Sequence, residues 1–264
     1  MKKRRIPLLI LVLAILGFSY LLAPIVIVVL AGLNSGDFLS FPPKGLSLRW
    51  VIAFLQSEKY LSSFFFSFRL ALMTMVISTV LGTLYLSRQT RIWRGVLQSF
   101  FLSPVVLPGV VVGFSIYAFF ISTEFPLVRT IWGLWVGHIL YSTPYVIGTV
   151  GAALAAYDLS LEEAARSLGA SPVRAFFKVT LPIIAPAIQA GSVFAFIVSF
   201  GQFEVSLFLS APNSEPLPIA MYNSLRYKFE PDAAAAGIFA ICLVTAAVLL
   251  TNRLVNLRKL LHRV

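Results

Sequence analysis

Long runs of apolar residues alternate with short polar segments along this chain of 264 residues. An α-helix rises 1.5 Å per residue, so about 20 consecutive apolar residues cross the hydrocarbon core of a bilayer. We expect a membrane-spanning helix in each of six runs: Ile6–Leu33, Phe64–Leu86, Val96–Ile121, Thr130–Ala156, Ile183–Ser210 and Ala233–Thr251. The predicted fold class is therefore all-α: a polytopic membrane protein with six transmembrane helices.

Composition favours the same class. Hydrophobic residues make up 59% of the chain, charged residues 12%, and the mean hydropathy is +0.90. The charged share is about half of that in a soluble domain, so the bilayer is the natural solvent. The sequence MKKRR before the first run is also how a signal peptide begins. However, Ile6–Leu33 is longer than a signal-peptide core, so we expect a retained helix.

The net charge of +11 would suggest nucleic-acid binding in a soluble protein. Here the basic residues lie at the edges of apolar runs, so we expect membrane lipid and no nucleic acid as a partner. Six spans place both termini on one side, which holds 14 of the 21 Lys and Arg residues. They are Lys2, Lys3, Arg4, Arg5, Arg88, Arg91, Arg94, Arg166, Arg174, Lys178, Arg253, Arg258, Lys259 and Arg263. Both termini are therefore predicted to be cytoplasmic.

This topology defines the predicted organisation of the chain. Residues 1–60 hold the first span and an outer loop, 61–255 form a five-span core, and 256–264 form a cytoplasmic tail. The Pro-containing segments Phe38–Trp50 and Ala211–Pro218 are predicted to be outer loops. Neither loop is long enough to hold a catalytic domain.

Residues that bind metals or form disulfides are few. Cys242 is the single cysteine, so no internal disulfide can form, and we expect it to be a small packing residue. His138 and His262 are the two histidines and are far apart in the sequence. No metal site is predicted.

The cytoplasmic segment Tyr157–Pro182 is unusually polar for this chain. Ser160 followed by Glu163 is typical of a capping box, in which a hydroxyl and a carboxylate pair with backbone N–H groups. A helix is predicted over 161–168, ending at Gly169, because glycine accepts a left-handed backbone. Ser171 as cap and Pro172 at the first position predict a second helix that ends by Pro182.

The first of these helices has one apolar stripe. Leu161, Ala164, Ala165 and Leu168 recur at helical spacing. A helix of two turns is marginal in water alone. It either docks into a groove of a partner or packs on its own bundle, and the residues alone leave both readings open.

The stretch EAARSLGASPVRAFFKVTLP resembles the EAA loop of permease subunits in bacterial type I ABC importers. In that family the loop is a coupling helix that enters a cleft of a cytoplasmic ATPase. The resemblance implies that the coupling residues are Glu162, Glu163, Ala164, Ala165, Leu168, Gly169 and Arg174. It also implies a cytoplasmic ATPase dimer that binds ATP and Mg²⁺, a second homologous permease and an external binding protein, with no cofactor in this chain.

Three other stretches resemble the same family. They are SPVVLPGVVVGF, SFGQFEVSLFLSAP and LPIAMYNSLRYKFEPDAAAAG, and the last is most like the second permease of the spermidine/putrescine group. The resemblance implies a bacterial inner-membrane protein that carries polyamine by alternating access. Members of that group often have an acidic pair near positions 201–203, where this chain has Gly201-Gln202-Phe203-Glu204. Ferric ion, 2-aminoethylphosphonate and other small organic ions therefore remain alternatives.

Glu204 is the one acidic residue within a predicted span. A carboxylate in the membrane marks a translocation pathway or pairs with a partner such as Arg69, and both readings stay open. Gln202, Tyr141 and Tyr145 join it as candidate pathway residues, because aromatic rings can hold an organic cation. His138 and the tyrosines are equally compatible with helix packing.

Two other function classes are alternatives to transport. The sequence has no G-x-x-x-x-G-K-[ST] loop, so we do not expect this chain to hydrolyse ATP. A membrane-embedded enzyme would need clustered His, Asp or Glu at membrane depth, and Glu204 stands alone. A docking or assembly protein would use the capped loop without moving a solute.

Overall fold

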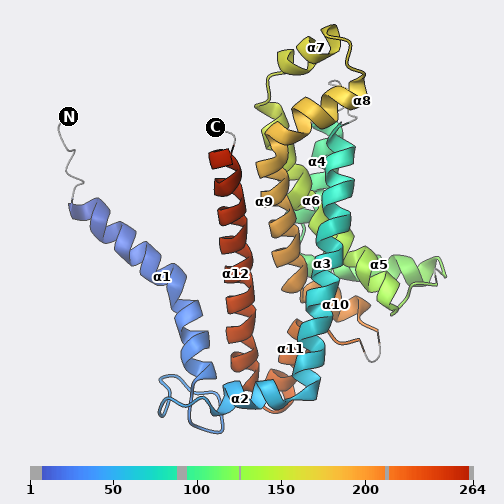
Figure 1. Ribbon diagram of the computed structural model, residues 1–264. Coiled ribbons are helices and arrows are strands. Elements are labelled where there is room, and N and C mark those ends of the chain that lie inside the picture. The colour runs from blue at the N-terminus through green and yellow to red at the C-terminus, as the bar shows by residue number, and fades with distance from the viewer. Residues whose placement is uncertain (1–7, 88–93, 125, 212–213, 262–264) are drawn as a thin grey trace. The chain divides into compact units, whose positions relative to one another are not determined.

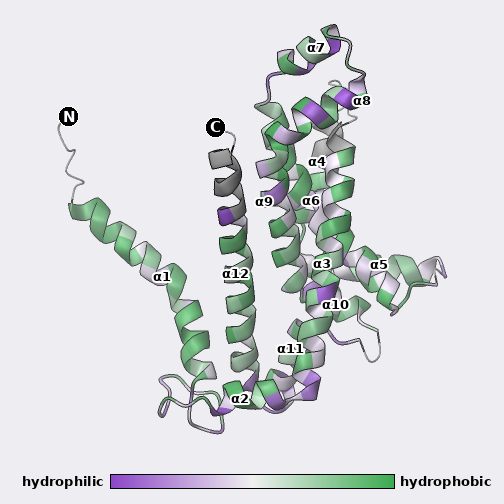
Figure 2. Cartoon of the chain, in the orientation of Figure 1, coloured by the Kyte–Doolittle hydropathy of each residue, from purple (hydrophilic) through white to green (hydrophobic). Residues whose placement is uncertain are grey.

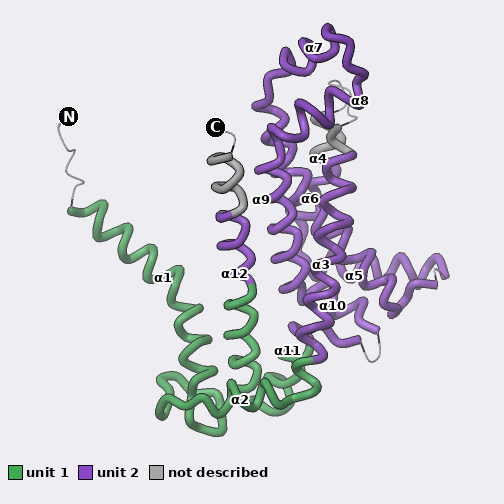
Figure 3. Tube along the Cα trace, viewed as in Figure 1, with its two compact units in different colours: residues 1–61, 220–243 green, residues 62–219, 244–264 purple. Residues whose placement is uncertain are grey.

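The computed structural model describes residues 8–87, 94–124, 126–211 and 214–261, and the regular elements in these ranges are helices (Figure 1). The predicted positions of Lys2–Arg5, Arg88, Arg91, His262 and Arg263 lie outside these ranges. The chain forms two compact units (Figure 3). One contains Met1–Leu61 with Ala220–Leu243, and the other contains Ser62–Ile219 with Val244–Val264.

The first unit joins α1 (Leu8–Gly32), α2 (Arg49–Gln56) and the beginning of α12 (Asp232–Leu261). Gly32 of α1 allows a close approach to α12, because a Cβ at this position would lie 2.9 Å from the backbone of Ala234 and Ala235. The loop after α1 folds around Asn34, which is fully buried. Its Oδ1 accepts hydrogen bonds from two backbone N–H groups, and its Nδ2 donates to the carbonyl of Phe38.

The second unit contains the longer helical bundle. Its elements are α3 (Glu58–Ser87), α4 (Arg94–Val106), α5 (Gly109–Ser122), α6 (Ile131–Ala155), α7 (Ser160–Ser167), α8 (Pro172–Ala175), π-turn η1 (Phe176–Thr180), α9 (Leu181–Phe200) and α10 (Glu204–Leu209). The start of α11 (Leu217–Tyr227) also belongs to it. One hydrophobic core, which includes Val146, Val150 and Ile184, joins α6 to α9. A second core joins α3, α5, α6 and α10 through Leu70, Phe120, Leu134, Val205 and Leu209.

Among the described residues, four helices are long and apolar enough to span a bilayer, and the number is six if each of two bent pairs counts as one span. This agrees with the predicted all-α membrane fold. The predicted third span is α4 followed by α5, bent by 111° after Val106. Pro108, which precedes α5, lacks the N–H needed to continue a helix and disfavours a helical residue before it.

The predicted fifth span has wrong limits. The helical run begins at Pro172 and ends at Phe200, so α10 is a separate short helix. The prediction that the helix ends by Pro182 is also wrong. The π-turn before it bonds Leu181 N–H to Phe176 O, five residues back, and this wider turn accommodates the proline ring within one continuous helix.

Two further features were missed by sequence reasoning. α2 and α11 begin inside the segments predicted to be outer loops. α3 has a buried face of hydroxyl residues, which pair across helices: Ser67 Oγ accepts from Leu217 N–H at 2.7 Å, and Thr143 donates to Ser78 Oγ. The prediction for Cys242 as a packing residue is wrong, since this thiol is exposed.

Candidate functional site

α7 lies beyond the end of α6 and the beginning of α9, and polar residues gather at this end of the second unit (Figure 2). Its N-terminus differs from the predicted capping box. Ser160 is the first helical residue, and its N–H donates to Asp158 Oδ1 at 3.0 Å. The predicted capping box is therefore wrong: the N-cap residue is Leu159, whose side chain makes no capping bond, and the Asp158 carboxylate binds the first helical N–H instead. Hydrogen bonds from Ser160 lower the pKa of the Asp158 carboxyl below its usual value.

The C-terminus of α7 is as predicted. Gly169 has a φ of +88°, in the left-handed region. Its N–H donates to Arg166 O, and the next N–H, of Ala170, donates to Ala165 O. These two bonds form a Schellman motif, which satisfies carbonyls at the end of the helix. Ser171 then caps α8, as predicted, by accepting from Arg174 N–H.

Three of the four residues of the apolar stripe of α7 are exposed in the described part of the chain. No residue of α7 is buried, and Leu168 has 91% of its surface exposed. Leu161 and Ala164 are also exposed, whereas Ala165 is half-buried. Among the described residues, this exposure disfavours the alternative that the stripe packs on its own bundle. The stripe is free to enter a groove in a partner.

The remaining predicted coupling residues divide between two surfaces. Glu163 lines a shallow, open concavity between α7 and α8, together with Arg166, Ser167, Ala170 and Pro172. Arg174 lies on α8 and is exposed. Glu162 turns toward the bundle instead, and its Oε2 accepts a hydrogen bond from the buried Thr180 at 2.8 Å.

Glu204 lies next to the break between α4 and α5. It is the first residue of α10 and is half-buried. A Cβ added to Gly109, the first residue of α5, would lie 3.3 Å from Glu204 Oε2. The first N–H groups of a helix lack partners within the helix and form the positive end of its dipole. The carboxylate therefore lies at the electropositive end of α5.

The predicted pathway residues are only partly brought together. Tyr141 and Tyr145 lie one helical turn apart on α6, and Glu204 begins α10. Tyr141 also packs against the core between α5, α6 and α10. Gln202 is 4% exposed, and within the described part of the chain its Nε2 has no hydrogen-bond partner. Arg69 is exposed and donates to the carbonyl of Phe65 on its own helix.

His138 joins three helices by hydrogen bonds. Its Nδ1 lies 2.9 Å from Ser199 Oγ on α9, and its Nε2 lies 3.0 Å from Ser206 Oγ on α10. The Ser206 hydroxyl donates its single proton to Gln202 O. It must therefore accept from His138 Nε2–H, which leaves Nδ1 to accept from Ser199. The contacts of His138 therefore support the packing reading. Its two serine partners lie 61 and 68 residues away in the sequence, so no local pattern could have predicted them.

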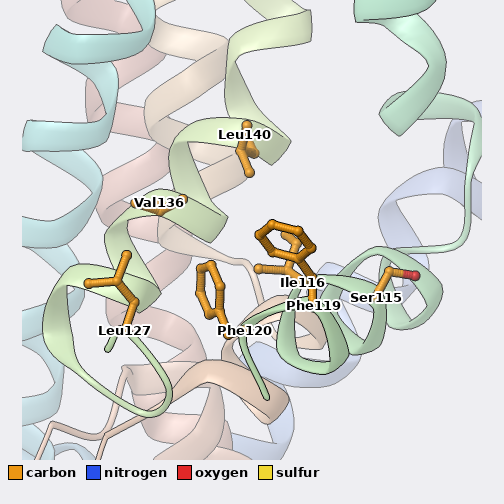
Figure 4. Close-up of a pocket in the computed structure, with 7 residues that line it drawn as sticks. All are labelled: Ser115, Ile116, Phe119, Phe120, Leu127, Val136 and Leu140. Atoms are coloured by element: carbon orange, nitrogen blue, oxygen red, sulfur yellow. The ribbon is translucent and has the colours of Figure 1, made fainter. Parts of the chain in front are cut away.

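An apolar cavity of about 410 Å³ lies between α5 and α6 (Figure 4). Its lining comprises Ser115, Ile116, Phe119, Phe120, Leu127, Val136 and Leu140. It contains no charged group to hold a polar solute. Among the described residues there is also no group of three or more His, Cys, Asp or Glu side chains placed to hold a metal ion.

Comparison with known proteins gives a consistent result. The model of a family described as binding-protein-dependent transport system inner membrane component matches residues 75–258. The putrescine transport system permease protein PotI of Escherichia coli (strain K12) is 31% identical over 232 residues, covering 85% of this chain and 82% of that protein. The spermidine/putrescine transport system permease protein PotC of the same organism is 28% identical over 239 residues, covering 88% of each chain.

Solved structures share the fold at lower identity. A chain of a bacterial ABC transporter that imports the acidic polysaccharide alginate matches with a TM-score of 0.67 at 18% identity, covering 93% of each chain. A chain of the MetNI methionine ABC transporter matches with a TM-score of 0.58 at 17% identity, covering 76% of this chain and 98% of that one.

Proposed function

Because this chain belongs to the family of binding-protein-dependent transport system inner membrane components, we propose that it is a permease subunit of a polyamine ABC importer. In this proposal an external binding protein delivers the solute. A cytoplasmic ATPase dimer, with ATP and Mg²⁺, drives alternating access of this chain and a second homologous permease. The two polyamine-system permeases among its relatives support the substrate class.

The observation that carries the proposal is the outward stripe on α7. Exposed Leu161, Ala164 and Leu168 form an apolar ridge that no described residue of this chain buries. Burying one leucine side chain contributes about 1.5–3 kcal/mol, so a groove that covers this ridge gains several kcal/mol. Glu163 and Arg174 flank the ridge with charges suited to the polar rim of an interface.

The Glu204 carboxylate, next to the break between α4 and α5, suits a cationic solute. Glu204 begins α10, and Tyr141 packs against the core that includes the next residue, Val205. A carboxylate and aromatic rings both attract an alkylammonium group. A carboxylate in the pathway would repel an anion such as a phosphonate. Opening of the bundle near α10 would bring Gln202 Nε2, which has no hydrogen-bond partner among the described residues, to the same solute.

The orientation follows from the proposed docking. If α7 meets a cytoplasmic ATPase, both termini of a six-span chain lie on the cytoplasmic side of the inner membrane. That agrees with the excess of Lys and Arg on that side.

The test is uptake by the complete importer in proteoliposomes, with radiolabelled putrescine supplied on its binding protein. We expect uptake that requires ATP on the ATPase side and that excess unlabelled spermidine suppresses. ATP-dependent uptake of ferric ion or 2-aminoethylphosphonate, with putrescine excluded, would contradict the substrate class. Hydrolysis without any solute uptake would contradict the transport function.

A further inference from the structure

Glu162 differs from the other residues of α7 in where its side chain points. It is half-buried on a helix that has no buried residue, and its carboxylate meets Thr180, the last residue of the π-turn η1. Thr180 is 3% exposed, so its hydroxyl depends on protein partners. The contact joins two segments that are 18 residues apart in the sequence.

A third residue completes a hydrogen-bond chain. Thr180 Oγ1 lies 3.2 Å from the Tyr157 hydroxyl oxygen and 2.8 Å from Glu162 Oε2. An ionised carboxylate accepts only, so Thr180 must give its single proton to Glu162. The Tyr157 hydroxyl is then the donor to Thr180. The order Tyr157, Thr180, Glu162 is therefore fixed by the number of protons available.

The chain of bonds links the two ends of the polar segment. Tyr157 follows α6, Glu162 lies in the first turn of α7, and Thr180 directly precedes α9. We propose that this chain of bonds holds α7 against the base of α9, so that a displacement of α7 moves α9 instead of being absorbed by the connections at 156–159 and 168–171. Glu162 is thus a positioning residue that acts inward, through Thr180, and not a contact to the partner that covers the outer stripe.

The inference rests on the proposed function, because the ATPase is what would move α7. The hydrogen bonds themselves can be tested without any transport measurement. Thr180→Val removes the hydroxyl at nearly constant shape, Thr180→Ser keeps it, and Glu162→Ala removes the acceptor. Ser167→Ala is the matched control, since the Ser167 hydroxyl bonds only to Glu163 O within α7 among the described contacts. All variants are made in the complete importer in nanodiscs.

The first measurement is hydrogen–deuterium exchange of the α7 amides. Thr180→Val and Glu162→Ala should each speed exchange about tenfold, as expected for loss of a hydrogen bond to a charged group. The double variant should exchange no faster than either single one, because both remove the same bond. Thr180→Ser and Ser167→Ala should match the unaltered protein. Unchanged exchange in Thr180→Val, or multiplied effects in the double variant, overturns the inference.

The second measurement separates positioning from docking. With putrescine and its binding protein, Thr180→Val and Glu162→Ala should lower the solute moved per ATP hydrolysed about tenfold. The amount of ATPase that co-purifies should stay constant, because the outer stripe is intact. Loss of ATPase in Glu162→Ala but not in Thr180→Val would mean that Glu162 contacts the ATPase directly. If the unaltered importer moves no putrescine, the proposed function fails, while the exchange result still decides the hydrogen bonds.

Discussion

Replacement of Gly169 by alanine should weaken the docking of α7 through its backbone alone. Gly169 has a φ of +88°, and a Cβ added there would meet no atom within 4 Å. The cost is therefore the left-handed conformation, about 1–2 kcal/mol for an L-residue. Reduced freedom of the unfolded chain offsets about 0.4–1 kcal/mol of it. The Schellman motif at the end of α7 therefore loses about 1 kcal/mol of stability. If docking requires this motif, the ATPase binds about fivefold more weakly.

The assay is titration of the permease pair in nanodiscs with the labelled ATPase dimer. Gly169→Asn should lose less affinity than Gly169→Ala, because asparagine tolerates the left-handed region better. Gly17→Ala is the matched control: its added Cβ also meets nothing within 4 Å, but it lies inside helix α1. Equal affinity of Gly169→Ala and the unaltered protein, or a larger loss in Gly169→Asn, would refute the reasoning.

Three further predictions concern the bundle, the bend and the N-terminus of α7. Gly191→Ala should destabilise the α6–α9 packing by about 1–3 kcal/mol, because the added Cβ would meet Thr149 Oγ1 and the Val146 backbone. Gly148→Ala is the control, since its Cβ would meet only a leucine methyl at 3.7 Å. Equal thermal midpoints for the two variants would contradict this prediction. Glu204→Gln should slow putrescine uptake about tenfold while ATPase co-purification stays normal, and unchanged uptake would remove Glu204 from the pathway. Because the pKa of Asp158 is lowered in the folded chain, the stability from its hydrogen bond to Ser160 is present above the unfolded pKa and is lost as pH falls through the folded pKa. The α7 amides should therefore exchange faster below about pH 4. Asp158→Asn should abolish this pH dependence, and a pH dependence that persists in the variant would belong to another group.

The extent to which sequence reasoning succeeded depends on the element. α6 agrees with the predicted span Thr130–Ala156 to within one residue at each end, because the apolar run delimits it; in the structure Thr130 caps it, with Oγ1 accepting from Gly133 N–H. Gly169 was predicted as the end of α7 for an equally local reason. Such signals involve residues within one helical turn of each other in the sequence, so they can be recognised without knowledge of tertiary contacts.

The errors have a common physical origin in tertiary structure. Pro182 is a helix breaker by local rules, yet the π-turn before it lets the helix continue. Glu204 was placed inside a span, because the break after Phe200 carries no proline and only one glycine. The inward contact of Glu162 with Thr180 joins residues that no helical periodicity relates. Pairings of that kind become visible only once α7 and α9 are placed in space.

The central claim is that the outward stripe of α7 docks a cytoplasmic ATPase. Its most direct test is gentle extraction of the unaltered protein from native membranes, followed by mass spectrometry of what co-purifies, with Ala165→Arg as the variant that places a charge on the stripe. We predict an ATPase and a second polytopic permease with the unaltered protein, and loss of the ATPase alone with Ala165→Arg. Reproducible isolation of this chain without any ATPase, or retention of the ATPase by Ala165→Arg, would contradict the claim.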